Sequence, residues 1–464
     1  MKKTTNEKTV AKKTAKKPKP PGPRTLAAFY TAIIDGNVEG VAKHLPDLAN
    51  VARVGKYGGD DPPLVIAAGV HDNIEIVRRL LDAGADVTGS TNPFKQNALH
   101  VACGQNQLDT ATLLIERGVP VNDKDIDKET PYMQARHPEI RARLRAAGVP
   151  GFAGRGGKQL HPKSKVVDSE AIEASDGMLA FDSEGRAWIA SHQGIYCKSG
   201  DTVTRYTFER DLNGATGWRT SGIGAGAGGK MYIGVNDGLI EVDGKTFTLF
   251  DRTNSELVDA HYTTTGPDGR AYMVSRETEE VWPVPQYITV FDGNTFTQLV
   301  AGRDFPGGRS ESAPLYIGPE GLEIRCLAFD PDGNLVIGAK GAIAFKRDGA
   351  WHVEREAGLF DSASVYEIIV ERDVTWIGTQ RGVIEQREGR GQLHRTDGLA
   401  HHLAKRGDDL YIGYGYDPVR RLRGGTVETV AVQKETLPPG EVSDVAAGPD
   451  GKIWVVVGKR VVTL

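Results

Sequence analysis

The sequence predicts a multidomain chain in which an α-helical solenoid is followed by an all-β propeller of seven blades. Two internal repeats carry this prediction: a helical unit of about 33 to 36 residues and a strand pattern that recurs about every 40 residues. The hydrophobic fraction of 39% and the charged fraction of 25% are those of ordinary globular protein. The expected order is a basic tail (1–24), the helical repeats (25–150), a glycine-rich linker (151–162) and the propeller (163–464).

The tail is strongly basic. Eight lysines and Arg24 stand against the single acid Glu7, a net charge of +8 in a chain of net charge −4, so the remaining residues carry −12. The run KKTAKKPKPPGPR has no apolar periodicity and predicts a disordered arm. Such an arm either solubilises the protein or contacts nucleic acid phosphates. The lysines for that contact are Lys12, Lys13, Lys16, Lys17 and Lys19.

Several classes of protein are disfavoured by composition. Cys103, Cys197 and Cys326 are far apart and lack CxxC spacing, so neither a disulfide framework nor a zinc site is expected. No apolar run is long enough to span a membrane, and no signal-peptide core follows the basic start. Fingerprints such as GxSxG, HExxH and the P-loop are absent. We therefore expect a soluble cytoplasmic protein with no cofactor, no metal and no membrane partner.

The helical repeats are clearest in PPLVIAAGVHDNIEIVRRLLDAGADV (62–87) and NALHVACGQNQLDTATLLIERGVPV (97–121). Their apolar spacing predicts two short helices per unit, and Gly84 and Gly118 stand where the second helix must end in a left-handed cap. One atypical unit on each side, starting near residues 27 and 130, is expected to cap the array.

These residues resemble the ankyrin family. NALHVAC matches the turn and first helix of its repeat, and LLDAGADV matches its helix end and the finger that follows, with four units over about a quarter of the chain. The resemblance implies a stacked array that binds proteins through its concave face and fingers. His100 is expected to bond neighbouring backbone rather than a metal, and Cys103 to fill the core.

The second repeat is carried by the stretch TWIGT at Trp376. Seven copies have an aromatic or aliphatic residue at the position of Trp376, at intervals of 44, 40, 64, 40, 35 and 43 residues: Trp188, Tyr232, Tyr272, Val336, Trp376, Tyr411 and Trp454. An Asp-Gly turn precedes most copies, and a second strand and a hairpin follow, as in a four-stranded propeller blade. The aromatic should fill the space between blades, and the glycine should let the next sheet approach. The seventh copy has room for three strands, so we expect residues 164–170 to supply its outer strand and close the ring.

This region resembles the two-component regulator propeller repeat, best in VTWIGTQRGVIE (374–385). In that family such propellers are usually sensory domains ahead of a membrane helix and a kinase, and neither is recognisable here. The repeats with GPDG turns are also similar to the streptogramin lyases, which are seven-bladed enzymes.

A binding rim is expected where the loops leaving the TWIGT-type strands reach one face of the ring. Its predicted members are His192, Asn236, Asp237, Arg276, Lys340, Gln380, Arg381, Tyr414, Tyr416 and Asp417. No catalytic set is evident, because His192, His261 and the pair His401–His402 do not fall at matching blade positions.

Two interaction modules without a recognisable active site predict a non-catalytic scaffold for protein partners that the sequence does not identify. A propeller enzyme of lyase or hydrolase type that uses the rim, with His401, His402 and Asp417 as its testable members, is one alternative. Non-specific tethering to nucleic acid by the tail is another.

Overall fold

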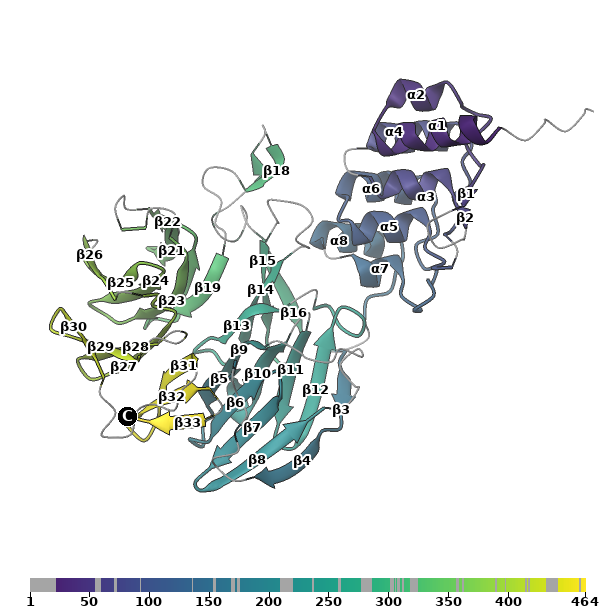
Figure 1. Ribbon diagram of the computed structural model, residues 1–464. Helices are drawn as coiled ribbons and strands as arrows, with labels where there is room; N and C mark the ends of the chain where they lie inside the picture. The colour runs from purple at the N-terminus through teal and green to yellow at the C-terminus, as the bar shows by residue number, and fades with distance from the viewer. Residues whose placement is uncertain are drawn as a thin grey trace, which may run out of the picture. The chain divides into compact units, whose positions relative to one another are not determined.

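The computed structural model describes residues 22–464 with gaps and forms two compact units (Figure 1). One unit runs to Ala135 and includes Glu139–Val149; the other holds Arg136–Pro138 and Pro150–Leu464. The gaps are 55–59, 71–72, 92, 136, 153–155, 168–171, 173–175, 209–219, 236–237, 258–259, 277–285, 301–303, 305, 307–308, 311–312, 318–323, 356–358, 361–362, 389, 397, 414, 416–417, 431–440 and 459.

The first unit is a stack of four helix pairs. Their helices are α1 (Pro23–Ile34), α2 (Val38–Ala42), α3 (Pro63–Ala68), α4 (Ile74–Asp82), α5 (Ala98–Gly104), α6 (Leu108–Glu116), α7 (Pro131–Gln134) and α8 (Pro138–Ala146), with a hairpin of β1 (Arg53–Val54) and β2 (Asp60–Asp61). First helices contact first helices along the series α1, α3, α5 and α7, and α4 contacts both α2 and α6. The predicted solenoid is therefore confirmed.

The ends of the second helices show why glycine recurs there. Gly84 and Gly118 have φ of +81° and +79°, and the residue after each donates its N–H back to the helix, as in Ala85 N to the Leu80 carbonyl at 2.9 Å. Glycine adopts this left-handed conformation without strain, which ends each helix at a fixed residue.

His100 has the structural role expected of it. Its side chain is fully buried, with Nδ1 3.3 Å from the backbone N of Asn97 and Nε2 3.2 Å from the carbonyl oxygen of Glu129. His100 thus connects the turn before its own helix with the loop before the next repeat through hydrogen-bond contacts to their backbones.

The second unit is a ring of seven blades among the described residues. Blades 1 to 3 comprise β5 (Met178–Phe181), β6 (Ala187–Ser191), β7 (Gly194–Ser199) and β8 (Thr202–Thr207); β9 (Thr220–Ala225), β10 (Met231–Val235), β11 (Gly238–Asp243) and β12 (Thr246–Asp251), with a 3₁₀ turn at Ala227–Gly229; and β13 (His261–Thr265), β14 (Ala271–Arg276), β15 (Gln286–Phe291) and β16 (Phe296–Val300).

The chain continues through a small two-stranded sheet into four more blades. These elements are β17 (Arg309–Ser310) and β18 (Ala313–Ile317); β19 (Ile324–Phe329), β20 (Leu335–Ala339), β21 (Ala342–Arg347) and β22 (Ala350–Glu354); β23 (Val365–Val370), β24 (Thr375–Thr379), β25 (Gly382–Arg387) and β26 (Arg390–His394); β27 (His402–Arg406), β28 (Asp409–Gly413), β29 (Arg420–Arg423) and β30 (Thr426–Thr429); and β31 (Val442–Ala447), β32 (Ile453–Val457) and β33 (Arg460–Thr463).

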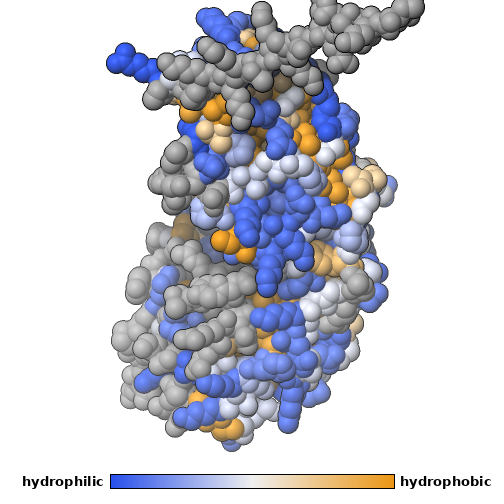
Figure 2. Space-filling view, turned by 90° about the vertical axis from the view of Figure 1, so that its right-hand side faces the viewer, coloured by the Kyte–Doolittle hydropathy of each residue, from blue (hydrophilic) through white to orange (hydrophobic). Residues whose placement is uncertain are grey.

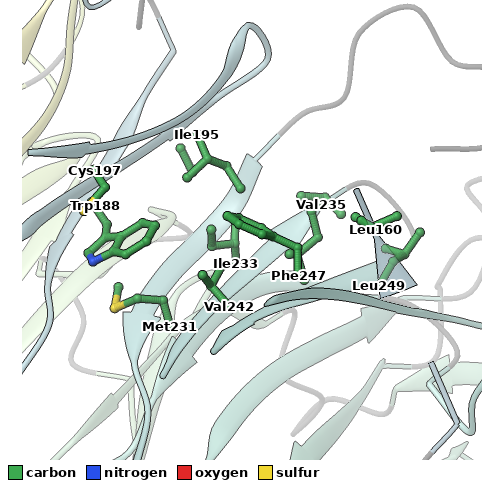
Figure 3. Close-up of a cluster of buried hydrophobic side chains, with 12 residues drawn as sticks. Leu160, Trp188, Ile195, Cys197, Met231, Ile233, Val235, Val242, Phe247 and Leu249 are labelled. Atoms are coloured by element: carbon green, nitrogen blue, oxygen red, sulfur yellow. The ribbon is translucent and has the colours of Figure 1, made fainter. Parts of the chain in front are cut away.

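The first strand of each blade is its inner strand. The inner strands contact one another in the cyclic order β5, β9, β13, β19, β23, β27, β31 and back to β5. Between blades lie apolar cores, such as the one in Figure 3, where Trp188 and Cys197 of blade 1 pack with Met231, Ile233 and Phe247 of blade 2. The ring is thus closed by packing of blade 7 on blade 1.

The expected source of ring closure is wrong. Residues 164–170 were expected to form the outer strand of blade 7, but β4 (Lys163–Val167) pairs antiparallel with β8 and becomes a fifth strand of blade 1. In the same way β3 (Lys158–Leu160), which lies in the segment expected to be a linker, pairs with β12 as a fifth strand of blade 2. The described residues of blade 7 form three strands. The outer edges of blade 1 and of blade 7 both have backbone N–H and C=O groups that a further strand can pair with. The repeat pattern alone therefore does not determine which of the two edges residues 164–170 join.

Close approach explains the glycine of the TWIGT-type strands. A Cβ on Gly378 would lie 2.4 Å from the carbonyl oxygen of Ala400, which leads into the next blade, and one on Gly234 would lie 2.0 Å from Thr263 Oγ1 of the next inner strand. The prediction that glycine lets the adjacent sheet approach is confirmed at these two blades.

The turns before the first and fifth copies position their tryptophans. Asp182 Oδ1 accepts the N–H groups of Glu184 and Arg186, while its Oδ2 accepts Trp188 Nε1 at 2.7 Å. In blade 5, Trp376 Nε1 likewise donates to Glu371 Oε2 at 2.9 Å. Trp188 and Trp376 are structural anchors, since the one polar atom of each is bound within its blade.

Candidate functional site

The loops that follow the second strands lie against the start of the next inner strand. Lys340, after β20, forms a backbone bridge with Ser364, just before β23. Ala400 N, just before β27, donates to the carbonyl oxygen of Thr379 at the end of β24, 2.9 Å away. These loops and inner-strand starts therefore share one face of the ring, which we call the loop face.

Five of the ten predicted rim residues are described. His192 Nδ1 lies 2.6 Å from Asp176 Oδ1, with both side chains about two-fifths exposed. Lys340, Gln380 and Arg381 lie between the second and third strands of blades 4 and 5, and Arg276 ends β14. The other predicted positions lie outside the described residues: Asn236, Asp237, Tyr414, Tyr416 and Asp417, and in the tail Lys12, Lys13, Lys16, Lys17 and Lys19.

A cluster of titratable side chains occupies the loop face at blades 5 to 7. His402 opens β27, and its Nδ1 lies 3.2 Å from Asp444 Oδ1 of β31. Its Nε2 lies 3.0 Å from Nδ1 of His401, whose ring stacks on Tyr366 of β23 at 4.5 Å between centroids. We name these four residues together with Glu367 the inner-strand cluster.

The two carboxyl groups of the cluster join neighbouring blades. Glu367 Oε2 accepts the N–H of Leu403 in blade 6 at 2.7 Å, and Asp444 Oδ2 accepts the N–H of Leu179 in blade 1 at 2.7 Å. Both carboxyl residues follow a register shift after the first residue of their strand. A β-bulge redirects side chains, and here it accompanies two carboxyl groups that each bond to the next inner strand.

The cluster contains groups with displaced proton affinities. Burial raises the pKa of Glu367 to about 8, against the opposing charge of His402. Burial, together with the charge of His402, lowers the pKa of His401 to about 3. Burial alone would lower the pKa of His402, but the hydrogen bond and charge of Asp444 raise it overall. Near neutral pH the cluster therefore holds a protonated Glu367 and a neutral His401, while Asp444 favours the charged form of His402.

Glu367 and Asp444 are not among the predicted site residues, because the predicted rim comprised loops after the TWIGT-type strands. A signal was present: VYEIIV (365–370) and VSDVAA (442–447) each carry a carboxyl residue at the third position of a largely apolar strand. An acid inside a buried strand needs a partner, so its recurrence in two blades points to a shared role.

Two cavities flank the turn between β23 and β24 at the other end of these strands. One, of about 930 Å³, lies between blades 4 and 5, and the second, of about 680 Å³, lies between blades 5 and 6. In the second, His394 Nε2 lies 2.9 Å from Glu385 Oε2. Side chains of both charges line each cavity, and none of the five described rim residues does.

Neither the face drawn in Figure 2 nor the metal-ligand chemistry of the described residues adds a site to the loop face and the two cavities. Figure 2 shows a largely hydrophilic face on which the coloured apolar residues form small separate groups. Among the described residues, no group of three or more His, Cys, Asp or Glu could hold a metal ion. The described helices include none with the length and apolar character of a membrane span.

Comparison with known proteins supports the helical repeats directly. A family model for ankyrin repeats matches residues 24–144 in three copies. An ankyrin repeat protein of Rickettsia bellii (strain RML369-C) is 34% identical over 65 residues, which are 14% of this chain and 8% of that protein. The chain thus spans a small part of this relative's length.

Solved structures similar to the chain are propellers of low identity. The extracellular domain of a hybrid two component system from B. thetaiotaomicron is 14% identical with a TM-score of 0.48, over 67% of this chain and 39% of that chain. A catalytically inactive virginiamycin B lyase from Staphylococcus aureus, solved with quinupristin, is 13% identical with a TM-score of 0.47, over 65% of this chain and 98% of that chain. The assignment of the propeller therefore rests on the strand topology itself. The chain carries ankyrin repeats in its N-terminal part, followed by a seven-bladed β-propeller.

Proposed function

We propose that this protein is a non-catalytic cytoplasmic scaffold that binds partner proteins through its ankyrin surface and the propeller rim. The observation that carries the proposal is a pair of exposed apolar side chains on neighbouring ankyrin fingers, the loops between repeats. Phe94 is 40% exposed and Ile126 is 51% exposed, and Ile126 N donates to the Phe94 carbonyl at 2.9 Å. Adjacent large apolar side chains that remain in water lower the free energy of a complex when a partner covers them.

The inner-strand cluster supports the same proposal. Its two carboxyl groups accept backbone N–H groups of neighbouring blades, and His402 pairs with Asp444. Such bonds hold the ring together and leave its loops as a rigid surface for recognition. The three cysteines are free and buried, which suits a reducing compartment.

The test uses full-length protein with both finger residues truncated, Phe94→Ala and Ile126→Ala. Proteins retained from the native cells are identified by mass spectrometry, with and without nuclease. We expect the double variant to lose retained partners by at least about tenfold, because truncating central apolar contacts costs on the order of 1–2 kcal/mol or more. The matched control is Ile34→Ala, an isoleucine 46% exposed at the end of α1.

Equal loss of partners in the finger variant and in Ile34→Ala would contradict the siting at the fingers. Retention that disappears with nuclease would instead favour contact of the basic tail with nucleic acid. An unchanged melting temperature in each variant shows that the loss does not come from unfolding.

A second candidate function is a propeller enzyme of lyase or hydrolase type, favoured by one observation. The series Asp444, His402, His401 is linked by contacts of 3.2 and 3.0 Å, and Glu367 nearby is held protonated. A protonated carboxyl group close to a linked histidine pair can supply the acid of general acid–base catalysis near neutral pH.

This candidate is tested on any hydrolytic or eliminating activity found with purified full-length protein. His401→Gln is expected to lower kcat by at least about a hundredfold and to alter its pH profile. The matched control is His192→Gln, because His192 also pairs with a carboxylate on blade 1. Equal activity of His401→Gln and wild type would exclude the cluster as the catalytic site.

A further inference from the structure

Among the described residues, the outer edge of blade 7 lies one strand closer to the ring axis than the edges of blades 3 to 6 and two strands closer than those of blades 1 and 2. Blades 3 to 6 have four strands and blades 1 and 2 have five, whereas the described residues of blade 7 form β31, β32 and β33. The edge strand is therefore β33, at the position that a third strand holds elsewhere.

The backbone of β33 has two positions that face away from β32. Leu464 and Ile453 exchange both of their backbone hydrogen bonds, at 2.7 and 3.3 Å. Bonded and non-bonded pairs alternate along an antiparallel ladder, and the register pairs Thr463 with Trp454 and Val461 with Val456. The N–H and C=O groups of Val461 and Thr463 therefore point outward, where a fourth strand would bind.

The apolar side chains at this edge are incompletely covered. Val462 and Leu464 pack, partly buried, against the core between blades 6 and 7, and Val461 packs against the core between blades 7 and 1. A strand beside β33 would satisfy the outward backbone groups and remove these side chains from water.

The fourth strands of blades 2 and 4 indicate what fits. In β12, Phe247 and Leu249 point into the core on either side of Thr248, and in β22 Trp351 and Val353 pack against the core around His352. These strands are five to six residues long. The occupant should share this alternation of apolar and polar residues.

Charge adds a preference at one end of such a segment. Asp251, the last residue of β12, lies opposite Gly238, the first residue of the third strand of its blade. The corresponding first residue of β33 is the exposed Arg460. An acidic residue at the end of the occupant would therefore face a positive charge.

We propose that β33 is a docking edge at which an extended segment of a partner protein, with alternating apolar and polar residues and an acidic end, adds as the fourth strand of blade 7. The added strand gains affinity from main-chain hydrogen bonds and specificity from its alternate side chains. This site lies on the propeller and goes beyond the proposed function at the ankyrin fingers.

The test measures binding of a fluorescent peptide to the full-length protein by anisotropy. The peptide has the sequence GKTFTLFDR, that of residues 244–252, which already forms a fourth strand in blade 2. We expect binding, and a dissociation constant at least tenfold weaker for a peptide of the same composition whose three apolar residues are adjacent. Equal affinity of the two peptides, or no binding of either, would overturn the proposal.

Two proline variants separate edge binding from unfolding. Thr463→Pro removes an outward N–H of β33 and should weaken peptide binding at least tenfold without changing the melting temperature. The control is Thr429→Pro on β30: since Val430 N donates to the Val419 carbonyl at 2.9 Å, the alternation turns the N–H of Thr429 outward as well. Equal binding by wild type and Thr463→Pro would refute the docking edge.

Hydrogen exchange identifies the occupant. The amides of Val461 and Thr463 should exchange rapidly in the free protein and slowly with saturating peptide, while that of Val462 stays slow throughout. Slow exchange of Val461 and Thr463 without peptide would contradict a partner strand. If that protection is independent of protein concentration, a segment of the same chain covers the edge; if it grows with concentration, a second copy does. Failure of this test leaves partner loss at the fingers unaffected, so the two proposals are distinguishable.

Discussion

Glu367 is a carboxyl group in surroundings that disfavour its ionised form. Burial raises its pKa from the ordinary value of 4.5 to about 8, although His402 and the N–H of Leu403 favour ionisation. Between these two values the folded state binds more protons than the unfolded chain. The free energy of unfolding therefore falls as the pH rises through this window, and the contribution of Glu367 is fully present only below about pH 4.5.

Glu367→Gln should make the propeller less sensitive to alkaline pH. An amide oxygen can still accept the N–H of Leu403 but has no proton to lose. Between pH 5 and pH 9 the wild type should lose at least about 2 kcal/mol more unfolding free energy than the variant. Urea denaturation at several pH values, followed by tryptophan fluorescence, measures this difference, because all six tryptophans lie between residues 188 and 454.

Glu388→Gln is the matched control, since Glu388 is exposed in a turn of the same blade. The control should follow the wild-type pH dependence. If Glu367→Gln did so too, the carboxyl group would be ionised in the folded protein at neutral pH, and the inner-strand cluster would hold no protonated acid.

At the scale of single residues, the sequence predicted the structural roles better than the site. Trp188 and Gly378 were assigned correctly because each belongs to a repeated pattern with a local physical cause, a wide gap to fill or a close contact to permit. Glu367 and Asp444 were not predicted as site residues, because their hydrogen-bond partners, Leu403 and Leu179, belong to other blades. Such pairings depend on tertiary contacts that no local pattern contains.

The strand β24 shows how one element serves two blades. Trp376 faces a core with residues of β27 and β28, and Gly378 allows the backbone at Ala400 to approach. Thr379 is buried, and its Oγ1 accepts the N–H of Arg381 and donates to the Gly382 carbonyl. In TWIGT, Trp376 therefore packs in the core between blades, Gly378 permits the close contact with the next blade, and Thr379 stabilises the turn that follows.

Gly378→Ala should destabilise the propeller by about 2 kcal/mol or more. The added Cβ would lie 2.4 Å from the Ala400 carbonyl oxygen, which is backbone and cannot rotate away. Thermal unfolding followed by tryptophan fluorescence would show a lower midpoint for the variant than for the wild type.

The matched control is Ala190→Gly, the reverse exchange at the same position of blade 1. Removal of a methyl group from a strand should cost about 1 kcal/mol or less, with no steric conflict. Equal midpoints for Gly378→Ala and the wild type would mean that blades 5 and 6 can move apart at this contact without loss of stability.

At the element scale, strands inside a blade were predictable and edge strands were not. Hairpin connections and repeated turns determine that β23 to β26 pair in sequence order. The pairing of β4 with β8, however, is a choice among several open edges, and the repeat pattern does not distinguish them. The expectation that residues 164–170 complete blade 7 was wrong for this reason.

For the whole molecule, the two repeat periods were sufficient to predict a helical solenoid and a seven-bladed ring. Because the units repeat, a feature such as the glycine at a helix end or the aspartate in a turn occurs in several units, and each occurrence supports the same prediction. Ring closure occurs at a single junction, between blades 7 and 1, so no second copy supports its prediction. The junction instead depends on β31 against β5 and on the bond from Leu179 N to Asp444.

The fifth strands β3 and β4 also set a mechanical order for the chain. If a partner held by the ankyrin repeats pulled on the polypeptide at residue 150, β3 would be the first propeller strand under tension, and it pairs with β12 at three positions. β4 is next, paired with β8 at five. Both are additions outside the four strands of their blades, so they can detach in turn while the ring stays closed. The order of these strands along the chain thus gives the propeller two strands that can detach one after the other under load before the ring itself is strained.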